Sequence, residues 1–139
     1  MSLCFDVTRE PDAADTGTLS AGLNQHAASR VGEDGFKPVA VFVRDENGEI
    51  HGGVTAYVNW NWLQISLLWV DEELRGEGLG SELLSRLEAI AKQEGCERAH
   101  VSTFSFQATA FYEAHGFTRF AQLEDYPPGE AKHFLKKDL

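Results

Sequence analysis

The apolar residues of this chain alternate between two spacings along its length. Stretches in which every second residue is apolar are typical of half-buried strands, whereas apolar residues three or four positions apart are typical of helices that face a core. The pattern predicts strands at residues 3–8, 37–44, 49–57, 62–70, 99–104, 117–124 and 132–137. It predicts helices after Pro11, where Leu19 and Leu23 supply the apolar face, and at 79–94 and 107–115. The order indicates a mixed α/β protein.

Turn signals connect several of these strands. Asn47-Gly48 is a strong hairpin sequence between the second and third strands, and a second turn falls near residues 59–61. The three strands between 37 and 70 are therefore expected to be antiparallel. Residues 127–129, Pro-Pro-Gly, mark the turn before the last strand.

Length, composition and charge indicate a small protein with a single domain, residues 1–139. With 42% hydrophobic residues, the chain can bury one core without disulfides or a metal, and no metal is expected. Cys4 and Cys96 lie far apart, and there is no secretory leader or long apolar span, so we expect a cytoplasmic protein. The net charge of −10 argues against nucleic acid and membrane surfaces and favours cationic partners.

The most informative segment is 67–82, where a strand pattern passes through a glycine-rich turn into a helix. Gly76, Gly78 and Gly80 allow a tight turn whose N–H groups converge on an anion at the start of the helix. Arg75 adds a positive charge at the mouth of the turn. A ligand with a phosphate or pyrophosphate is therefore expected.

Two common phosphate-binding motifs do not fit this turn. The ATP/GTP loop requires a Gly-Lys pair, and the chain contains none. The dinucleotide fingerprint requires a third small residue where Ser81 stands, and it normally opens the first β-α-β unit of a long parallel sheet. Here the turn lies past the middle of a short chain.

The turn resembles the coenzyme A loop of the GNAT superfamily of N-acetyltransferases, Gln/Arg-x-x-Gly-x-Gly/Ala. Arg75, Gly78 and Gly80 fill that pattern, and Gly76 and Leu79 complete the frequent Arg-Gly-x-Gly-Leu-Gly variant.

A second motif lies about thirty residues further on. Ala108, Phe111, Tyr112, Gly116 and Phe117 match the family's Ala-x-x-Phe/Leu-Tyr-x-x-x-Gly-Phe. Taken by itself, Tyr112 would be read as a half-buried core aromatic. The two motifs in the right order and spacing favour the family resemblance instead.

The resemblance implies an α/β (α+β type) fold: a central mixed, mostly antiparallel sheet of about six to seven strands, with helices on both faces. Two strands, here 62–70 and 99–104, splay apart, and acetyl-CoA lies between them as cosubstrate. Backbone groups near Leu68 and Val70 then bind the pantetheine arm, and the turn from Arg75 to Ser81 holds the pyrophosphate.

The resemblance also implies that Tyr112 protonates the departing thiolate. Where the family often carries Asn, seven residues before this Tyr, the chain has Ser105, so the cofactor contact is made by Ser105, passed to Gln107 or lost. No carboxylate occurs in strand 62–70, where many relatives place the general base. Spacing singles out none of the other candidates, which are His51, His100, Glu124, Asp125 and His133.

Three functions therefore remain open. The first is an acetyl-CoA-dependent N-acetyltransferase in which a primary amine, on a small cationic molecule or an exposed protein, attacks directly in a ternary complex. The second is a non-catalytic acyl-CoA-binding or regulatory module. The third, a nucleotide-binding protein, is disfavoured by the match at 108–117. A homodimer is also expected, through a sheet edge or apolar surface near the last strands or the Trp60 hairpin.

Overall fold

The computed structural model describes all 139 residues, which form two compact units, Met1–Asp34 and Gly35–Leu139. The first unit contains helix α1 (Ala13–Val31). The carboxylate of Asp12 caps this helix by accepting a hydrogen bond from the Ala14 N–H at 2.8 Å. The helix predicted after Pro11 is confirmed, and none of its residues is buried.

The strand predicted at residues 3–8 is wrong. Leu3, Phe5 and Val7 alternate with other residues, but they are 83%, 103% and 91% exposed, and no strand pairs with them. Alternation indicates only which face a strand could bury. A strand also needs a neighbour for its backbone hydrogen bonds, and this segment has none.

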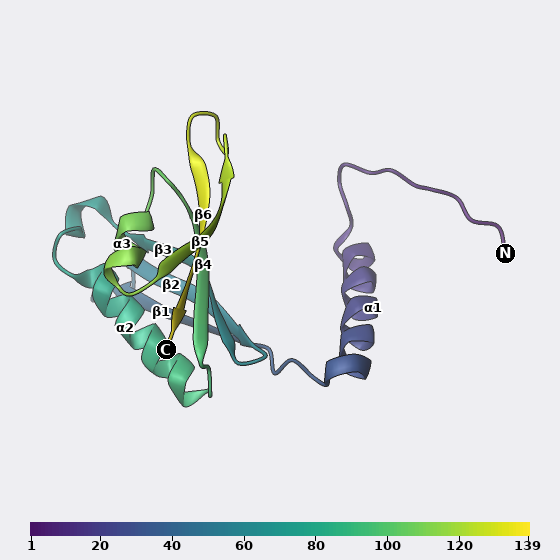
Figure 1. The fold of residues 1–139 in the computed structure, drawn as a ribbon, viewed down its shortest axis with the longest axis horizontal. Helices are drawn as coiled ribbons and strands as arrows, with labels where there is room; N and C mark the ends of the chain where they lie inside the picture. Colours follow the sequence, from purple (N-terminus) through teal and green to yellow (C-terminus); the bar gives the residue numbers. More distant parts are fainter. The chain divides into compact units, whose positions relative to one another are not determined.

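The second unit is built on a six-stranded sheet with the order β1-β2-β3-β4-β6-β5 (Figure 1). All neighbours are antiparallel except β3 and β4, which are parallel. The strands are β1 (Lys37–Arg44), β2 (Ile50–Asn59), β3 (Trp62–Val70), β4 (Arg98–Phe104), β5 (Thr118–Glu124) and β6 (Ala131–Asp138). The helices are α2 (Leu79–Gln93) and α3 (Thr109–Ala114), and a 3-10 turn, η1 (Glu72–Leu74), follows β3.

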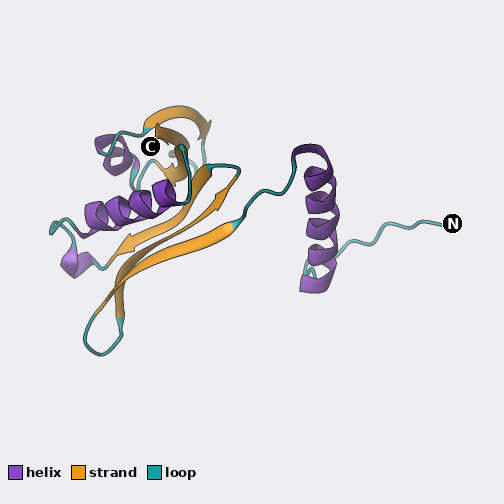
Figure 2. Cartoon of the chain, turned by 90° about the horizontal axis from the view of Figure 1, so that it is seen from below, coloured by secondary structure: helices purple, strands orange, loops and turns teal.

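The core lies between the sheet and the two helices of this unit. Helix α2 packs against β1, β2 and β3, as Figure 2 also shows, and buries Leu83, Leu84 and Leu87. Tyr112 of α3 belongs to the same core. Side chains on the opposite face of the strands stay accessible, and Trp69 is one of them. None of the helices combines the length and the apolar character needed to cross a membrane.

The parallel pair β3 and β4 separates partway along its length. The two strands pair only from Trp62 opposite Arg98 to Ile65 opposite Val101. Ser66 then forms a bulge against β2, and the rest of β3 runs on without β4 beside it. A bulge bends its strand, so backbone groups on one edge of β3 lose their sheet partners. This is the splayed strand pair that the family resemblance implies.

Candidate active site

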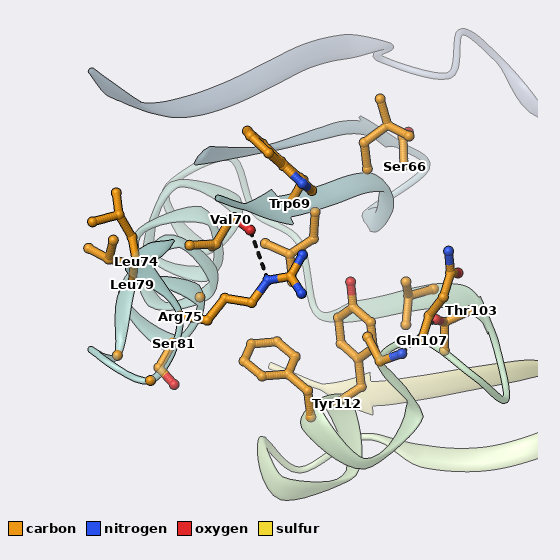
Figure 3. Close-up of a pocket in the computed structure, with 18 of the residues that line it drawn as sticks. Ser66, Trp69, Val70, Leu74, Arg75, Leu79, Ser81, Thr103, Gln107 and Tyr112 are labelled. Atoms are coloured by element: carbon orange, nitrogen blue, oxygen red, sulfur yellow. Dashed lines mark hydrogen bonds between the residues drawn. The ribbon is translucent and has the colours of Figure 1, made fainter. Parts of the chain in front are cut away.

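A pocket of about 720 Å³ opens where β3 and β4 separate (Figure 3). Its walls come from two regions of the sequence, residues 66–81 and 101–112, and the residues that line it are 66–70, 74–76, 78–81, 101–103, 106–108 and 111–112. Residues from both faces of β3, such as Leu67 and Leu68, line it. The pocket therefore runs through the gap in the sheet rather than over one surface.

The glycine turn forms one end of this pocket. Gly76 and Gly78 have φ angles of 84° and 80°, and a Cβ on either would meet no atom within 4 Å. Gly78 is the N-cap of α2, and the first hydrogen bond within the helix runs from the Glu82 N–H to the Gly78 carbonyl. The N–H groups of residues 79–81 are therefore available to an anion in this open space.

Gly80 lines the pocket and also contributes to the packing of the two helices. A Cβ on Gly80 would lie 3.3 Å from the ring of Phe111, so this glycine permits close packing of α2 against α3. Beside it, His115 links the same two helices: its Nε2 lies 2.9 Å from the Ser81 Oγ, and its Nδ1 lies 2.8 Å from the Phe111 carbonyl oxygen. Since that carbonyl can only accept, Nδ1 donates to it and Ser81 donates to Nε2.

Arg75 extends from the turn into the pocket (Figure 3). Its Nε donates a hydrogen bond of 3.1 Å to the Val70 carbonyl at the end of β3. The guanidinium therefore occupies one of the backbone acceptors left unpaired by the separation of the strands. The charge predicted at the mouth of the turn is present there, and the acidic residues near it, Glu72, Glu73 and Glu77, are exposed.

Tyr112 forms the opposite wall, and its hydroxyl points into the pocket (Figure 3). The residue is 3% exposed, with its ring edge-on to Phe111 at 5.3 Å and to Phe117 at 5.4 Å. Burial disfavours the phenolate and raises the pKa of Tyr112 to about 12. At neutral pH the group is thus a neutral phenol that can donate a proton or a hydrogen bond into the pocket.

The loop after β4 places Ser105 and Gln107 differently. Ser105 does not line the pocket; its hydroxyl donates to the Glu130 carboxylate and accepts from the Ala131 N–H at 2.9 Å. Gln107 does line the pocket, and its side-chain oxygen lies 3.5 Å from the Phe104 N–H. Of the two candidates for a cofactor contact, Gln107 is the one at the cavity.

No wall residue carries a carboxylate or an imidazole. His51 lies 2.8 Å from Asp45 and 3.6 Å from Asp71, and its pKa is raised, chiefly by the hydrogen bond with Asp45. Burial lowers the pKa of His100, and His133 is buried beside α3. The acidic candidates Glu124 and Asp125 are exposed. None of the five predicted base candidates reaches the pocket.

A splayed strand pair, an anion-binding turn at a helix start and a buried phenol facing the gap together define an acyltransferase site. The sequence model of the Acetyltransferase (GNAT) family matches residues 12–117, and the chain belongs to this family. Members of this family are acetyltransferases that use acetyl-CoA, and this protein is accordingly an acyltransferase.

Individual relatives agree with this assignment. The chain is 46% identical over 101 residues to blasticidin-S acetyltransferase of Streptomyces morookaense, which covers 72% of this chain and 74% of that protein. A crystal structure of an acetyltransferase from Bacillus cereus superposes with a TM-score of 0.86 at 34% identity, covering 96% and 98% of the two chains. A crystal structure from Agrobacterium tumefaciens gives a TM-score of 0.94 at 27% identity, covering 99% and 100%.

The raised pKa of Tyr112 predicts a loss of stability at high pH. Below pH 10 the phenol is protonated in both the folded and the unfolded chain, whereas between pH 10 and about 12 only the unfolded chain loses the proton. The free energy of unfolding should therefore fall by about 1.4 kcal/mol per pH unit in this window from this group alone. Denaturant titrations of wild type and Tyr112→Phe at pH 9.5 and 11 measure this fall in the free energy of unfolding. The contributions of all other titratable groups cancel when the two proteins are compared. Wild type should lose about 1 kcal/mol more than the variant, and an equal loss would contradict the assignment.

Proposed function

We propose that the protein transfers an acetyl group from acetyl-CoA to a primary amine by direct attack in a ternary complex. The observation that carries this proposal is the continuous pocket that joins the glycine turn to the Tyr112 hydroxyl along the unpaired edge of β3. It offers an anion site at one end, backbone hydrogen-bonding groups in the middle and a proton donor beside them.

The residues of this pocket suit successive parts of the cofactor. The N–H groups at Gly78, Leu79, Gly80 and Ser81 would hold the pyrophosphate, with the charge of Arg75 beside it. Backbone groups near Leu68 and Val70 would bond the pantetheine amides, as an added strand bonds an open sheet edge. When the cofactor takes the Val70 carbonyl, the Arg75 guanidinium is released toward the phosphates. From the loop after β4, Gln107 rather than Ser105 would contact the pantetheine arm.

The chemistry then rests on positioning and on one proton donor. The amine nitrogen attacks the thioester carbon, the C–S bond breaks, and the Tyr112 hydroxyl gives its proton to the departing sulfur. Because the wall contains no carboxylate or imidazole, water takes the amine protons: one before the nitrogen attacks, since the amine is protonated in solution, and a second as the amide forms. Tyr112 then regains a proton from water before the next turnover. Ser66 and Ser102 line the pocket and can orient that water.

A cationic acceptor is favoured by the charge of the protein. With a net charge of −10, the chain attracts amines, which are protonated in solution. The similarity to blasticidin-S acetyltransferase supports blasticidin-S and related antibiotic amines as the first acceptors to test, before exposed protein amines.

The pocket wall has no carboxylate or imidazole that could accept the amine proton, so transfer to an amine needs a direct test. Release of CoA from acetyl-CoA is followed with a thiol reagent over a panel of amines. Amine-dependent release supports the proposed transfer, and tight binding of acetyl-CoA without release for any amine contradicts it.

Replacing Gly78 should abolish acetyl-CoA binding. Gly78→Asp places a side chain and a negative charge where the phosphates would sit, at a φ of 80° that disfavours any side chain. Gly95→Asp is a matched control, because Gly95 has a φ of 85° and equally open surroundings at the other end of α2, outside the pocket. Calorimetry should detect binding in the control and not in Gly78→Asp; equal affinity in both would remove the turn from the site.

Replacing Tyr112 should separate catalysis from binding. Tyr112→Phe keeps the ring packing, so acetyl-CoA affinity should hold while kcat falls about ten- to a thousandfold. The deficit should be largest at low pH, where the thiolate most needs a proton. Tyr57→Phe serves as the control, because the Tyr57 hydroxyl donates a hydrogen bond to Gln64 and lies outside the pocket. Wild-type turnover by Tyr112→Phe on a verified amine would leave this residue a packing role only.

We also propose that the chain forms a homodimer through the β5 edge of the sheet. Strand β5 is terminal in the strand order, and Phe120 and Leu123 on it are 54% and 48% exposed. Sedimentation at about 50 micromolar should give twice the chain mass of 15.4 kDa, and Phe120→Asp should restore the monomer. A monomeric wild type at this concentration would contradict the proposal.

The compartment that we propose is the cytoplasm. Cys4 is exposed, Cys96 is buried, and both are free thiols. Free thiols are typical of a reducing compartment, where acetyl-CoA is also used as a cosubstrate.

A further inference from the structure

A lysine ammonium lies among three aromatic rings on the face of the sheet opposite α2. The Nζ of Lys132 is 5.8 Å from the ring centroid of Phe104, 5.5 Å from that of Tyr126 and 5.6 Å from that of Phe134. The rings come from β4, the β5–β6 turn and β6, so tertiary structure rather than local sequence brings them together. We call these three rings the aromatic box. Distances below 6 Å are those at which a ring attracts a cation.

The aromatic box holds this ammonium without help from a carboxylate. Lys132 forms no ion pair, although the protein carries 22 acidic residues against 12 Lys and Arg. Lys137, on the same strand, shows the usual arrangement, with its Nζ 2.6 Å from the Glu88 carboxylate. The rings are thus the partners of the Lys132 charge, and another compact organic cation can use the same ring faces.

A row of stacked rings connects the aromatic box to the pocket. The Phe104 ring lies 5.6 Å from that of Phe106 with an interplanar angle of 10°, and Phe106 lines the pocket. On its other side, Phe104 lies 5.4 Å from Tyr126. Phe106 and Tyr126 are 57% and 48% exposed, so a ligand can reach the row from solvent. A molecule whose amine enters the pocket can therefore lay a second group on the box.

We propose that the aromatic box is a subsite for a second cationic group of the acceptor, and that Lys132 is a resident cation which the acceptor displaces. The proposal rests on the proposed function in so far as it names the acceptor as the ligand. Displacement exchanges one cation–π contact for another, and the Lys132 head moves into water on a flexible stem. The acceptor class is then an amine that carries a further ammonium or guanidinium group.

The experiment uses a cation that cannot be acetylated, so it does not depend on transfer. Choline is titrated into the full chain without acetyl-CoA, and binding is followed through the ¹³C-labelled tyrosine rings. The chain has three tyrosines, and Tyr126→Phe assigns the Tyr126 signal. Two companions with a similar branched head test the charge: 3,3-dimethylbutan-1-ol is neutral and 3,3-dimethylbutanoate is anionic.

Lys132→Met removes the resident cation and keeps the stem. In this variant choline should bind about two- to thirtyfold more tightly than in wild type, with shifts at Tyr126, while the neutral alcohol shows no such gain. Lys136→Met is the matched control, because Lys136 lies over the Phe120 ring on the same strand and its loss changes the net charge equally. It should leave choline affinity unchanged.

Three results would overturn the proposal. Choline affinity that is unchanged in Lys132→Met shows that the box takes no external cation. Equal binding of the neutral alcohol shows an apolar patch without charge preference. Binding of the carboxylate to wild type, lost in Lys132→Met, shows that Lys132 anchors anions instead. If the wild type acetylates no amine, the proposed function fails, yet the choline result still decides whether the subsite exists.

Discussion

The separation of β3 from β4 is the constraint on which the rest of the structure depends. Their parallel ladder ends at Ile65 and Val101, and the bulge at Ser66 bends β3 away while β2 keeps it in the sheet. Backbone groups that a continuous sheet would satisfy are left facing a cavity, and Arg75 already donates to one of them. Because the connection to α2 leaves from the end of β3, the helix start and its free N–H groups lie at the same opening. The break in the ladder thus creates the pocket and sets the anion site beside it.

Helix α3 is too short to be stable by itself, and tertiary contacts at each end hold it in place. At one end, Thr109 Oγ1 lies 2.8 Å from Nδ1 of His133, whose Nε2 faces the Arg119 guanidinium at 3.4 Å. Because a guanidinium can only donate, Nε2 of His133 accepts from Arg119. Nδ1 then carries the ring hydrogen and donates a hydrogen bond to Thr109 Oγ1. At the other end, His115 Nε2 lies 2.9 Å from the Ser81 Oγ of α2, and in the middle of the helix Phe111 packs on Gly80. The position of Tyr112 therefore depends on both β6 and α2.

The sequence predicted those features that are encoded locally. Strands 37–44 and 62–70 match β1 and β3 at both ends, because turn residues lie next to them: Asn47-Gly48 follows the first strand, and the turn at residues 59–61 precedes the second. The open turn at Gly78 was likewise readable, since a positive φ at a helix start requires glycine. Contacts between segments that are distant in the sequence could not be predicted. The pairing of Ser105 with Glu130 and the packing of Phe111 on Gly80 depend on which surfaces meet, and no spacing in the chain reports that.

An acidic protein that, as we propose, uses an anionic cofactor and a cationic acceptor must attract opposite charges at neighbouring places. Its net charge of −10 assists the amine and opposes the phosphates. Backbone N–H groups at the turn overcome the repulsion of the phosphates, because their aligned dipoles attract an anion without adding net charge. The positive charge of Arg75 adds to this attraction. Across the sheet, ring faces around Lys132 attract a cation without adding negative charge that would repel the phosphates. Both sites therefore rely on dipoles and quadrupoles, whose influence falls off over a shorter range than that of full charges, so each can select its own ion beside the other.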